Sequence, residues 1–194
     1  MKKVLEHFKN ADPIIYQILI NNSFEVKAKP KSEYYSSLTR SIVYQQLNGK
    51  AAQTIYQRFT KAVDKENFTP KDILNTEIAV LRASGLSESK ANYVKNIAQA
   101  TTDGIVNFDI LNDLSNEEVI RVLTQIKGVG RWTAEMFLMF TLGREDIFSN
   151  GDYGLKKGIE KLYGPNYDLD NLEARWKPYR TYVSLALWHS LDNS

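Results

Sequence analysis

Residues 127–134 constrain the fold more than any other part of the chain. They read Lys-Gly-Val-Gly-Arg-Trp-Thr-Ala, between two stretches whose apolar residues recur at helical spacing. Two glycines around one apolar residue let the backbone turn tightly and approach a ligand closely. Because a helix begins directly after the turn, its unpaired amides and positive end form a site for an anion such as phosphate. An ordinary helix–helix turn is the alternative, but the full string between two amphipathic helices favours the phosphate-binding hairpin.

Helix-start signals recur along the whole chain. Capping residues stand before helical patterns, twice with Pro at the first helical position and once with the Glu of a capping box. The residues expected to begin helices are Asp12, Ser32, Thr69, Ser87, Ser115 and Lys177. No stretch alternates apolar and polar residues with the period of a strand. The sequence therefore predicts an all-α fold with essentially no sheet.

Composition excludes several chemistries. The chain has no cysteine and only two histidines, which excludes disulfides, a thiol nucleophile and a cysteine-bound iron–sulfur cluster, and disfavours a zinc site. No stretch approaches the roughly 18 apolar residues of a membrane span. The basic N-terminus lacks an apolar run of signal-peptide length. We therefore expect a soluble, intracellular protein with no membrane partner.

The charges are unevenly distributed although the net charge is only +2. Residues 27–61 contain seven Lys or Arg against a single Glu33, and residues 103–118 contain five Asp or Glu without a basic residue. Such polarity could turn a cationic face toward phosphates. Two solvated helix faces would give the same pattern, and the sequence leaves both open.

A weaker echo of the hairpin occupies residues 81–87 and is followed by Lys90 and Ala91. It contains a single glycine, Gly85, and precedes another helical pattern. The echo is either a second, degenerate hairpin or a simple turn within one lobe.

Three strings together resemble the helix-hairpin-helix DNA glycosylases, most of all the 3-methyladenine DNA glycosylase II (alkyladenine) subgroup. They lie at residues 42–52, 128–134 and 176–188, and the resemblance extends from about Ser32 to the C-terminus. It implies an all-α, two-lobed fold with DNA held in a central cleft, in a compact form without the N-terminal β-domain of some relatives.

The chain is expected to cross between the lobes at residues 27–31 and to return at residues 107–112. These crossings give one lobe of residues 31–108 and a second of residues 1–30 plus 109–194 within a single glycosylase domain.

The resemblance implies that Asp152, in the loop Phe-Ser-Asn-Gly-Asp-Tyr-Gly, is the catalytic carboxylate. Cleaving the bond between base and deoxyribose builds positive charge on the sugar, which a carboxylate stabilises. An alkylated purine already carries positive charge, so it leaves without strong acid assistance. Without the flanking motifs, helix capping would be the better interpretation of Asp152. The loop lacks the Pro common in the family.

Aromatic faces recognise an electron-poor base through stacking and cation–π attraction. The candidate pocket residues are Trp132, Trp188, Tyr44, Tyr35 and Met136, and core packing is the alternative for each aromatic residue. Met136 stands where some relatives have a pocket Tyr. Bifunctional relatives place at Trp132 a Lys that forms a Schiff base. An indole cannot form one, so the resemblance implies a monofunctional enzyme.

DNA contacts are expected from the hairpin and from the region of Gln46 and Leu47. The hairpin candidates are Lys127, Gly128, Val129, Gly130, Arg131 and Thr133. Flipping the base leaves a gap in the duplex, and the resemblance implies that Gln46 or Leu47 fills it, although Leu47 could instead be a core leucine. The resemblance further implies one Na+ or K+ ion on the carbonyls of Thr124, Ile126 and Val129, with no cofactor required.

The sequence therefore predicts a monomeric, monofunctional DNA glycosylase acting on double-stranded DNA. Its substrates would be alkylated purines of the 3-methyladenine and 7-methylguanine type, and its product an abasic site in base excision repair. One alternative is a glycosylase for other damaged or mismatched bases. Another is a non-catalytic helix-hairpin-helix protein that only binds DNA.

Overall fold

The computed structural model describes residues 1–47, 49–63 and 67–192. Within these residues the chain forms helices joined by loops and contains no strand, which confirms the predicted fold class. It divides into two compact units. The terminal unit comprises Met1–Ala28 and Leu142–Ser194, and the central unit comprises Lys29–Thr141. In the described part of the chain, no helix is long and apolar enough to cross a membrane.

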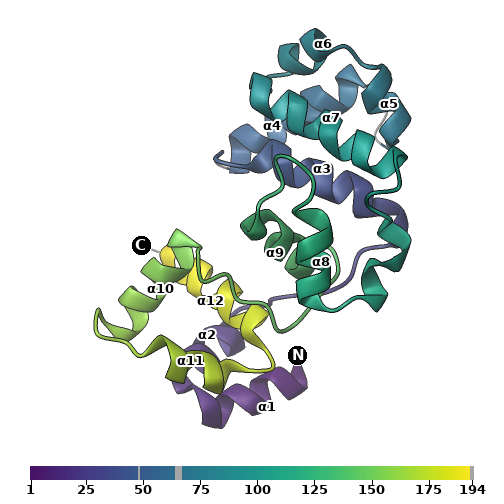
Figure 1. The fold of residues 1–194 in the computed structure, drawn as a ribbon. Coiled ribbons are helices and arrows are strands. Elements are labelled where there is room, and N and C mark those ends of the chain that lie inside the picture. The colour runs from purple at the N-terminus through teal and green to yellow at the C-terminus, as the bar shows by residue number, and fades with distance from the viewer. Residues whose placement is uncertain (48, 64–66, 193–194) are drawn as a thin grey trace. The chain divides into compact units, whose positions relative to one another are not determined.

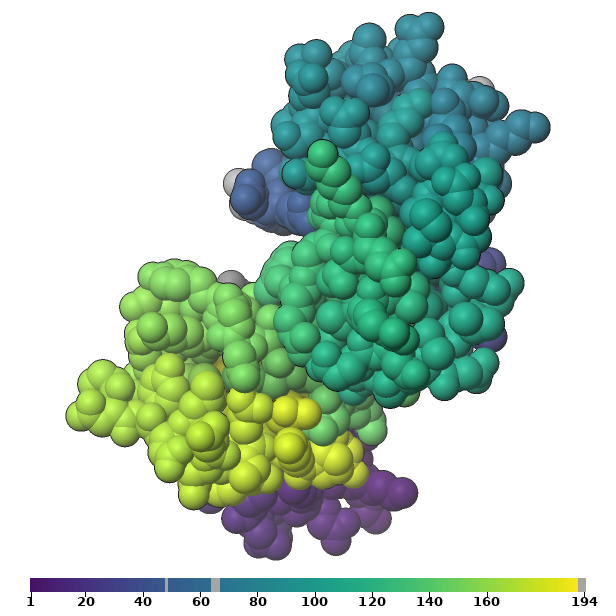
Figure 2. Space-filling view, in the orientation of Figure 1, coloured from purple at the N-terminus to yellow at the C-terminus, as the bar shows by residue number. Residues whose placement is uncertain are grey.

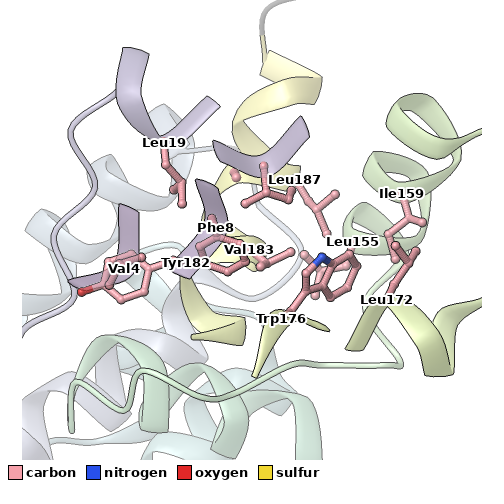
Figure 3. Close-up of a cluster of buried hydrophobic side chains, with 12 residues drawn as sticks. Val4, Phe8, Leu19, Leu155, Ile159, Leu172, Trp176, Tyr182, Val183 and Leu187 are labelled. Atoms are coloured by element: carbon pink, nitrogen blue, oxygen red, sulfur yellow. The ribbon is translucent and has the colours of Figure 1, made fainter. Parts of the chain in front are cut away.

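The terminal unit joins the two ends of the chain. Its purple N-terminal helices lie beside its green and yellow C-terminal helices (Figure 1). The helices of this unit are α1 (Lys2–Ala11), α2 (Pro13–Asn21), α10 (Tyr153–Tyr163), α11 (Leu169–Trp176) and α12 (Arg180–Asp192). Trp176 is fully buried in their shared core, next to Leu155 and Leu172 (Figure 3).

Asp12 holds three of these helices together. One carboxylate oxygen accepts hydrogen bonds from the amides of Ile14 and Ile15, which caps α2 as the sequence predicts. The other accepts from the Tyr163 hydroxyl at 2.7 Å and the Trp176 indole at 2.9 Å. Burial is the main cause that raises the pKa of Tyr163, and the neighbouring Asp12 carboxylate raises this pKa further. The carboxylate therefore connects the start of α2 to α10 and α11.

The central unit contains the remaining helices. They are η1 (Lys31–Glu33), α3 (Tyr34–Tyr44), α4 (Gly49–Ala62), α5 (Pro70–Asn75), α6 (Ile78–Ala83), α7 (Glu88–Thr102), η2 (Phe108–Asp113), α8 (Asn116–Leu123) and α9 (Arg131–Phe140). Helix α3 packs against α4, α7 and α9. The buried ring of Tyr34 meets Phe137 of α9 edge to face, with ring centroids 5.9 Å apart.

Most of the predicted helix starts are confirmed. Thr69 and Ser115 form capping boxes, and Ser87 caps α7. Two predictions are wrong. Ser32 lies within the short helix η1, so α3 begins without a side-chain cap. The last helix begins at Arg180 instead of Lys177, after a turn with a cis Lys177–Pro178 bond, and the Arg180 amide bonds Asp146.

The boundaries of the units differ from the expected crossings at one of two places. The first boundary falls between Ala28 and Lys29, inside the expected crossing at residues 27–31. The second falls between Thr141 and Leu142 instead of at residues 107–112. Helices α8 and α9 stay in the central unit because they pack on each other and α9 packs on α3.

Replacing Asp12 by Ala should lower the free energy of unfolding by about 3 kcal/mol or more, because it removes a helix cap and leaves the buried Trp176 indole and the half-buried Tyr163 hydroxyl without this acceptor. Asp168→Ala is the matched control, since Asp168 caps α11 from an exposed position and its loss should cost only about 1 kcal/mol. Urea unfolding measures both. Equal losses would contradict the role assigned to the buried network.

Candidate functional site

Asp152 is fixed at the start of α10 by two N–H donors. Its Oδ1 atom accepts a hydrogen bond from the Leu155 amide at 2.8 Å and from the Trp188 indole at 3.1 Å. The residue is half-buried. Helix capping and a catalytic role were alternatives from the sequence, but a carboxylate has several acceptor positions and can serve in both.

Gly154 permits this arrangement. A Cβ atom built on Gly154 would lie 3.1 Å from Asp152 Oδ1 and 3.1 Å from Trp188 Nε1, closer than ordinary van der Waals contact. The absence of a side chain therefore lets the indole reach the carboxylate. The ring nitrogen of Trp188 donates to Asp152 and orients it, while the stacking of a base on the Trp188 ring stays a prediction.

Tyr153 is the residue that the sequence analysis missed. It directly follows Asp152 and is 73% exposed, the most exposed of the large apolar and aromatic side chains recorded for the described residues. Helix α10 buries Leu155 and Ile159, and Tyr153 projects from another face. An aromatic residue off the buried face of a helix, next to a candidate carboxylate, was the available signal.

The loop before Asp152 is anchored to the start of α12. The Thr181 hydroxyl accepts from the Ile147 amide at 3.0 Å and donates to the Arg144 carbonyl at 2.6 Å. Arg180 forms ion pairs with Asp146 at 2.7 Å and Glu173 at 2.9 Å. These contacts fix the loop although it lacks the Pro common in relatives.

The hairpin between α8 and α9 has the expected turn. Gly128 has a φ of +107°, and a Cβ there would lie 2.2 Å from the ring of Tyr93 on α7. Buried Val129 donates its amide to the Ile126 carbonyl at 2.9 Å. In the space-filling view the green segment that joins α8 and α9 lies against the teal surface of the same unit (Figure 2). Gly128 is therefore required by both conformation and space.

The N-terminus of α9 is available to an anion. Exposed Gly130 precedes the helix and supplies no capping side chain. The first amides of a helix have no partner within it, so they can bind a phosphate oxygen. Lys127 is exposed beside this end of the helix.

Two of the side chains predicted to contact DNA make contacts within their own unit. Arg131 forms ion pairs with Glu117 at 2.7 Å and Glu135 at 2.9 Å, and its hydrogen bond lowers the pKa of Glu117. Its charge is thus offset by two carboxylates, and the pair with Glu117 joins α9 to α8. Thr133 is buried, and its hydroxyl accepts a hydrogen bond from Gln45 Nε2 at 3.0 Å.

The α3–α4 loop, residues 45–47, exposes the two residues predicted to fill the duplex. Leu47 is 37% exposed, which excludes the core interpretation. Gln46 is exposed with a φ of 56°, the only non-glycine with positive φ in the described ranges. This left-handed conformation costs of order 1 kcal/mol or more, so it persists only where contacts with the surrounding structure offset that cost.

The other residues predicted to line the base pocket differ in their exposure and contacts. Trp132 is 42% exposed at the first turn of α9, and Met136 is buried one turn later on the same helix. The guanidinium of Arg40 lies 4.8 Å from the centroid of the Tyr44 ring. Tyr35 packs between Phe68 and Phe108 with a buried hydroxyl, which favours core packing over base binding.

The three carbonyls expected to hold an alkali ion lie at or just after the C-terminal end of α8. No group of three or more His, Cys, Asp or Glu that could hold a metal ion occurs in the part of the chain that the structure describes. Carbonyl oxygens at the negative end of a helix suit Na+ or K+. The Ile126 carbonyl accepts one bond, from Val129, and retains a second lone pair. Carbonyl oxygens are therefore suitable donors for such an ion, whose presence at this position stays a prediction.

The fold and the hairpin define a class of protein that comparison with known families identifies. Residues 39–179 match the HhH-GPD superfamily of base excision DNA repair proteins, and the chain belongs to that superfamily.

Individual relatives are similar to this chain over more residues than the family match covers. The chain is 36% identical over 178 residues to DNA-3-methyladenine glycosylase 1 of Schizosaccharomyces pombe. This alignment covers 88% of this chain and 78% of the relative. A crystal structure of a DNA-3-methyladenine glycosidase from Bacillus halodurans is 34% identical, with a TM-score of 0.81 over 96% of this chain and 88% of that chain. An S. pombe 3-methyladenine DNA glycosylase in complex with abasic DNA is 32% identical, with a TM-score of 0.84 over 98% and 97%.

Gly128→Ala should lower the free energy of unfolding by at least about 2 kcal/mol, because Ala disfavours the left-handed conformation and would collide with Tyr93. Gly130→Ala is the control. Gly130 has a φ of −86° and open space around it, so the loss should be about 1 kcal/mol or less. Chemical denaturation gives both values, and similar losses would argue against the conformation described for the hairpin.

Proposed function

We propose that this chain is a monofunctional DNA glycosylase that removes alkylated purines from double-stranded DNA. It hydrolyses the N-glycosidic bond of bases of the 3-methyladenine and 7-methylguanine type and leaves an abasic site in base excision repair. The observation that carries the proposal is the Asp152 carboxylate, held by the Leu155 amide and the Trp188 indole. Its family and its similarity to 3-methyladenine glycosylases support the substrate class.

Asp152 supplies the charge that the reaction requires. As the bond between base and sugar breaks, positive charge builds on the deoxyribose, and a fixed carboxylate stabilises it without reorganising. The Trp188 indole donates a hydrogen bond to this carboxylate and orients it. An alkylated purine leaves readily, so a second carboxylic acid is not needed to protonate the leaving group.

The aromatic residues match a cationic base. Tyr153 and Trp132 are exposed rings, one next to Asp152 and one next to the hairpin. An exposed ring attracts an electron-poor, positively charged purine more strongly than a neutral one. We propose that both residues contribute to base recognition.

Trp132 determines the reaction type. An enzyme that also cuts the strand needs an amine to form a Schiff base with the sugar. Trp132 stands where bifunctional relatives carry that lysine, and its indole nitrogen is not nucleophilic. Hydrolysis without strand cleavage follows.

The hairpin binds the DNA backbone without reading sequence. The uncapped N-terminus of α9 and the exposed Lys127 suit a phosphate group. We propose that one Na+ or K+ ion on the carbonyls of Thr124, Ile126 and Val129 completes this contact. The protein needs no other cofactor, acts as a monomer and works on the DNA inside the cell.

Asp152→Asn should reduce release of 3-methyladenine from methylated DNA by at least about 100-fold, because the neutral amide cannot stabilise the sugar cation. Asn also caps helices well, so stability and DNA affinity should be retained. Single-turnover release of bases and binding to undamaged duplex measure the two effects.

The control for that experiment is Asp168→Asn, which makes the same change at another helix cap. It should leave release unchanged. A panel of duplexes with alkylated, oxidised or mismatched bases identifies the substrate. Unchanged release by Asp152→Asn would remove Asp152 from the mechanism, and no release by the native protein from any duplex would favour a protein that only binds DNA.

The alkali ion has a measurable consequence. At equal ionic strength, the affinity for DNA should be lower in tetramethylammonium chloride than in potassium chloride, because the bulky cation cannot enter a cluster of carbonyls. Fluorescence anisotropy with a labelled duplex gives both dissociation constants. Equal constants in the two salts would show that the hairpin binds phosphate without an ion.

A further inference from the structure

Lys90 of α7 makes an unusual contact with the α3–α4 loop. Its Nζ atom donates to the carbonyl of Val43 at 2.9 Å and to the carbonyl of Gln45 at 2.6 Å. Val43 lies in the last turn of α3, and Gln45 is the first residue after that helix. The half-buried ammonium thus satisfies carbonyls that the end of a helix leaves without a partner.

The same loop is held from its other side. The Gln45 side chain donates to Thr133 Oγ1 at 3.0 Å, at the start of α9. Gln45 therefore has its carbonyl fixed by Lys90 and its amide group fixed by Thr133. The next residue, Gln46, takes the left-handed conformation, which persists only when its surroundings determine it.

Helix α7 also holds the hairpin. Asn96 donates its side-chain amide to the Lys127 carbonyl at 3.0 Å, and the ring of Tyr93 fills the space beside Gly128. One helix face of the central unit thus contacts both segments that we propose to bind DNA. The face carries Lys90, Tyr93 and Asn96, which follow one another at intervals of three residues along α7.

We propose that Lys90 is a positioning residue that holds residues 45–47 in the conformation in which they enter the gap left by a flipped base. This inference rests on the proposed function. Lys90 itself touches neither substrate nor reacting atoms. It acts through two backbone carbonyls, so the side chains of Gln46 and Leu47 remain exposed for the DNA.

The chemistry of the residue fits this role. A lysine ammonium has three donors and no acceptor, so one group can bind two carbonyls at once. Partial burial lowers the pKa of Lys90. Lys90 follows the sequence echo of the hairpin at residues 81–87. The echo thus forms the turn before α7, where Gly85 has a φ of +105° against Ile55, and it places the lysine beside the loop.

The test compares Lys90→Met with Lys95→Met. Lys95 lies on the same helix, donates to a backbone carbonyl, that of Leu74 at 2.8 Å, and also has a pKa lowered by burial. It holds the end of α5 and has no recorded contact with the α3–α4 loop, so Lys95→Met reports the general cost of losing such a contact. Entry of the loop into the gap is followed by the change in fluorescence of 2-aminopurine placed opposite an abasic site analogue when the protein binds.

Lys90→Met should reduce the change in 2-aminopurine fluorescence on binding, and should reduce single-turnover release of 3-methyladenine roughly ten- to hundredfold. Affinity for undamaged duplex, and its dependence on salt, should stay within about twofold because the phosphate contacts of the hairpin remain. Lys95→Met should change all three readouts by less than about twofold, and Lys90→Arg should recover most of the release because a guanidinium also donates to two carbonyls.

An unchanged 2-aminopurine signal in Lys90→Met would overturn the inference, as would a parallel loss of affinity for undamaged duplex. If Lys90→Met does not fold, Lys90→Gln replaces it with the same expectations, because its side chain is one atom shorter and should not reach both carbonyls. Should the native protein release no base from any duplex, the proposed function fails separately. The 2-aminopurine comparison still decides the role of Lys90, because filling a gap in DNA requires no chemistry.

Discussion

A carboxylate held by two N–H donors is the feature on which the chemistry of this protein depends. Asp152 would stabilise little if its side chain were free to rotate, since a charge must already be in place when the sugar cation forms. The Leu155 amide fixes it because Asp152 caps α10, and the Trp188 indole fixes it from α12. A structural duty, helix capping, thus positions the group that we propose to act in catalysis.

Two glycines are required for different reasons, one beside Asp152 and one in the hairpin. Gly154 has an ordinary helical environment and is needed for space, because a side chain would separate Trp188 from Asp152. Gly128 is needed for both space and conformation, because its φ is positive and Tyr93 lies against it. Neither glycine contacts a reacting atom, so each matters through the close approach that it allows.

Much of the fold could be predicted because the signals were local. Asp12, Thr69, Ser87 and Ser115 cap helices through residues two or three positions away, and such spacing is legible in a sequence. The predictions for Ser32 and Lys177 were wrong because each residue type can also occur where no long helix begins. Ser32 lies within a short helix, and Lys177 lies in a turn before the last helix. Gly128 and Asp152 were identified because both belong to compact motifs.

The remaining site residues could not be predicted because their roles depend on partners far away in the sequence. Arg131 was expected to meet phosphate, but Glu117, fourteen residues earlier, binds it. Tyr35 was expected in a pocket, but Phe68 and Phe108 enclose it. Each of these side chains has a type suited to DNA and makes contacts within its own unit, ion pairs for Arg131 and ring contacts for Tyr35.

The contacts that shape the proposed DNA-binding segments are mostly bonds from side chains to backbone carbonyls. Such bonds leave no trace in the residue that accepts them, since every residue has a carbonyl. Lys90 therefore looked like one more charge on a helix, although it binds the carbonyls of Val43 and Gln45 from more than forty positions away. A loop whose side chains must stay available for a ligand is best held in this way, because its shape is then set by its backbone and its exposed residues remain free to be selected for contact with DNA.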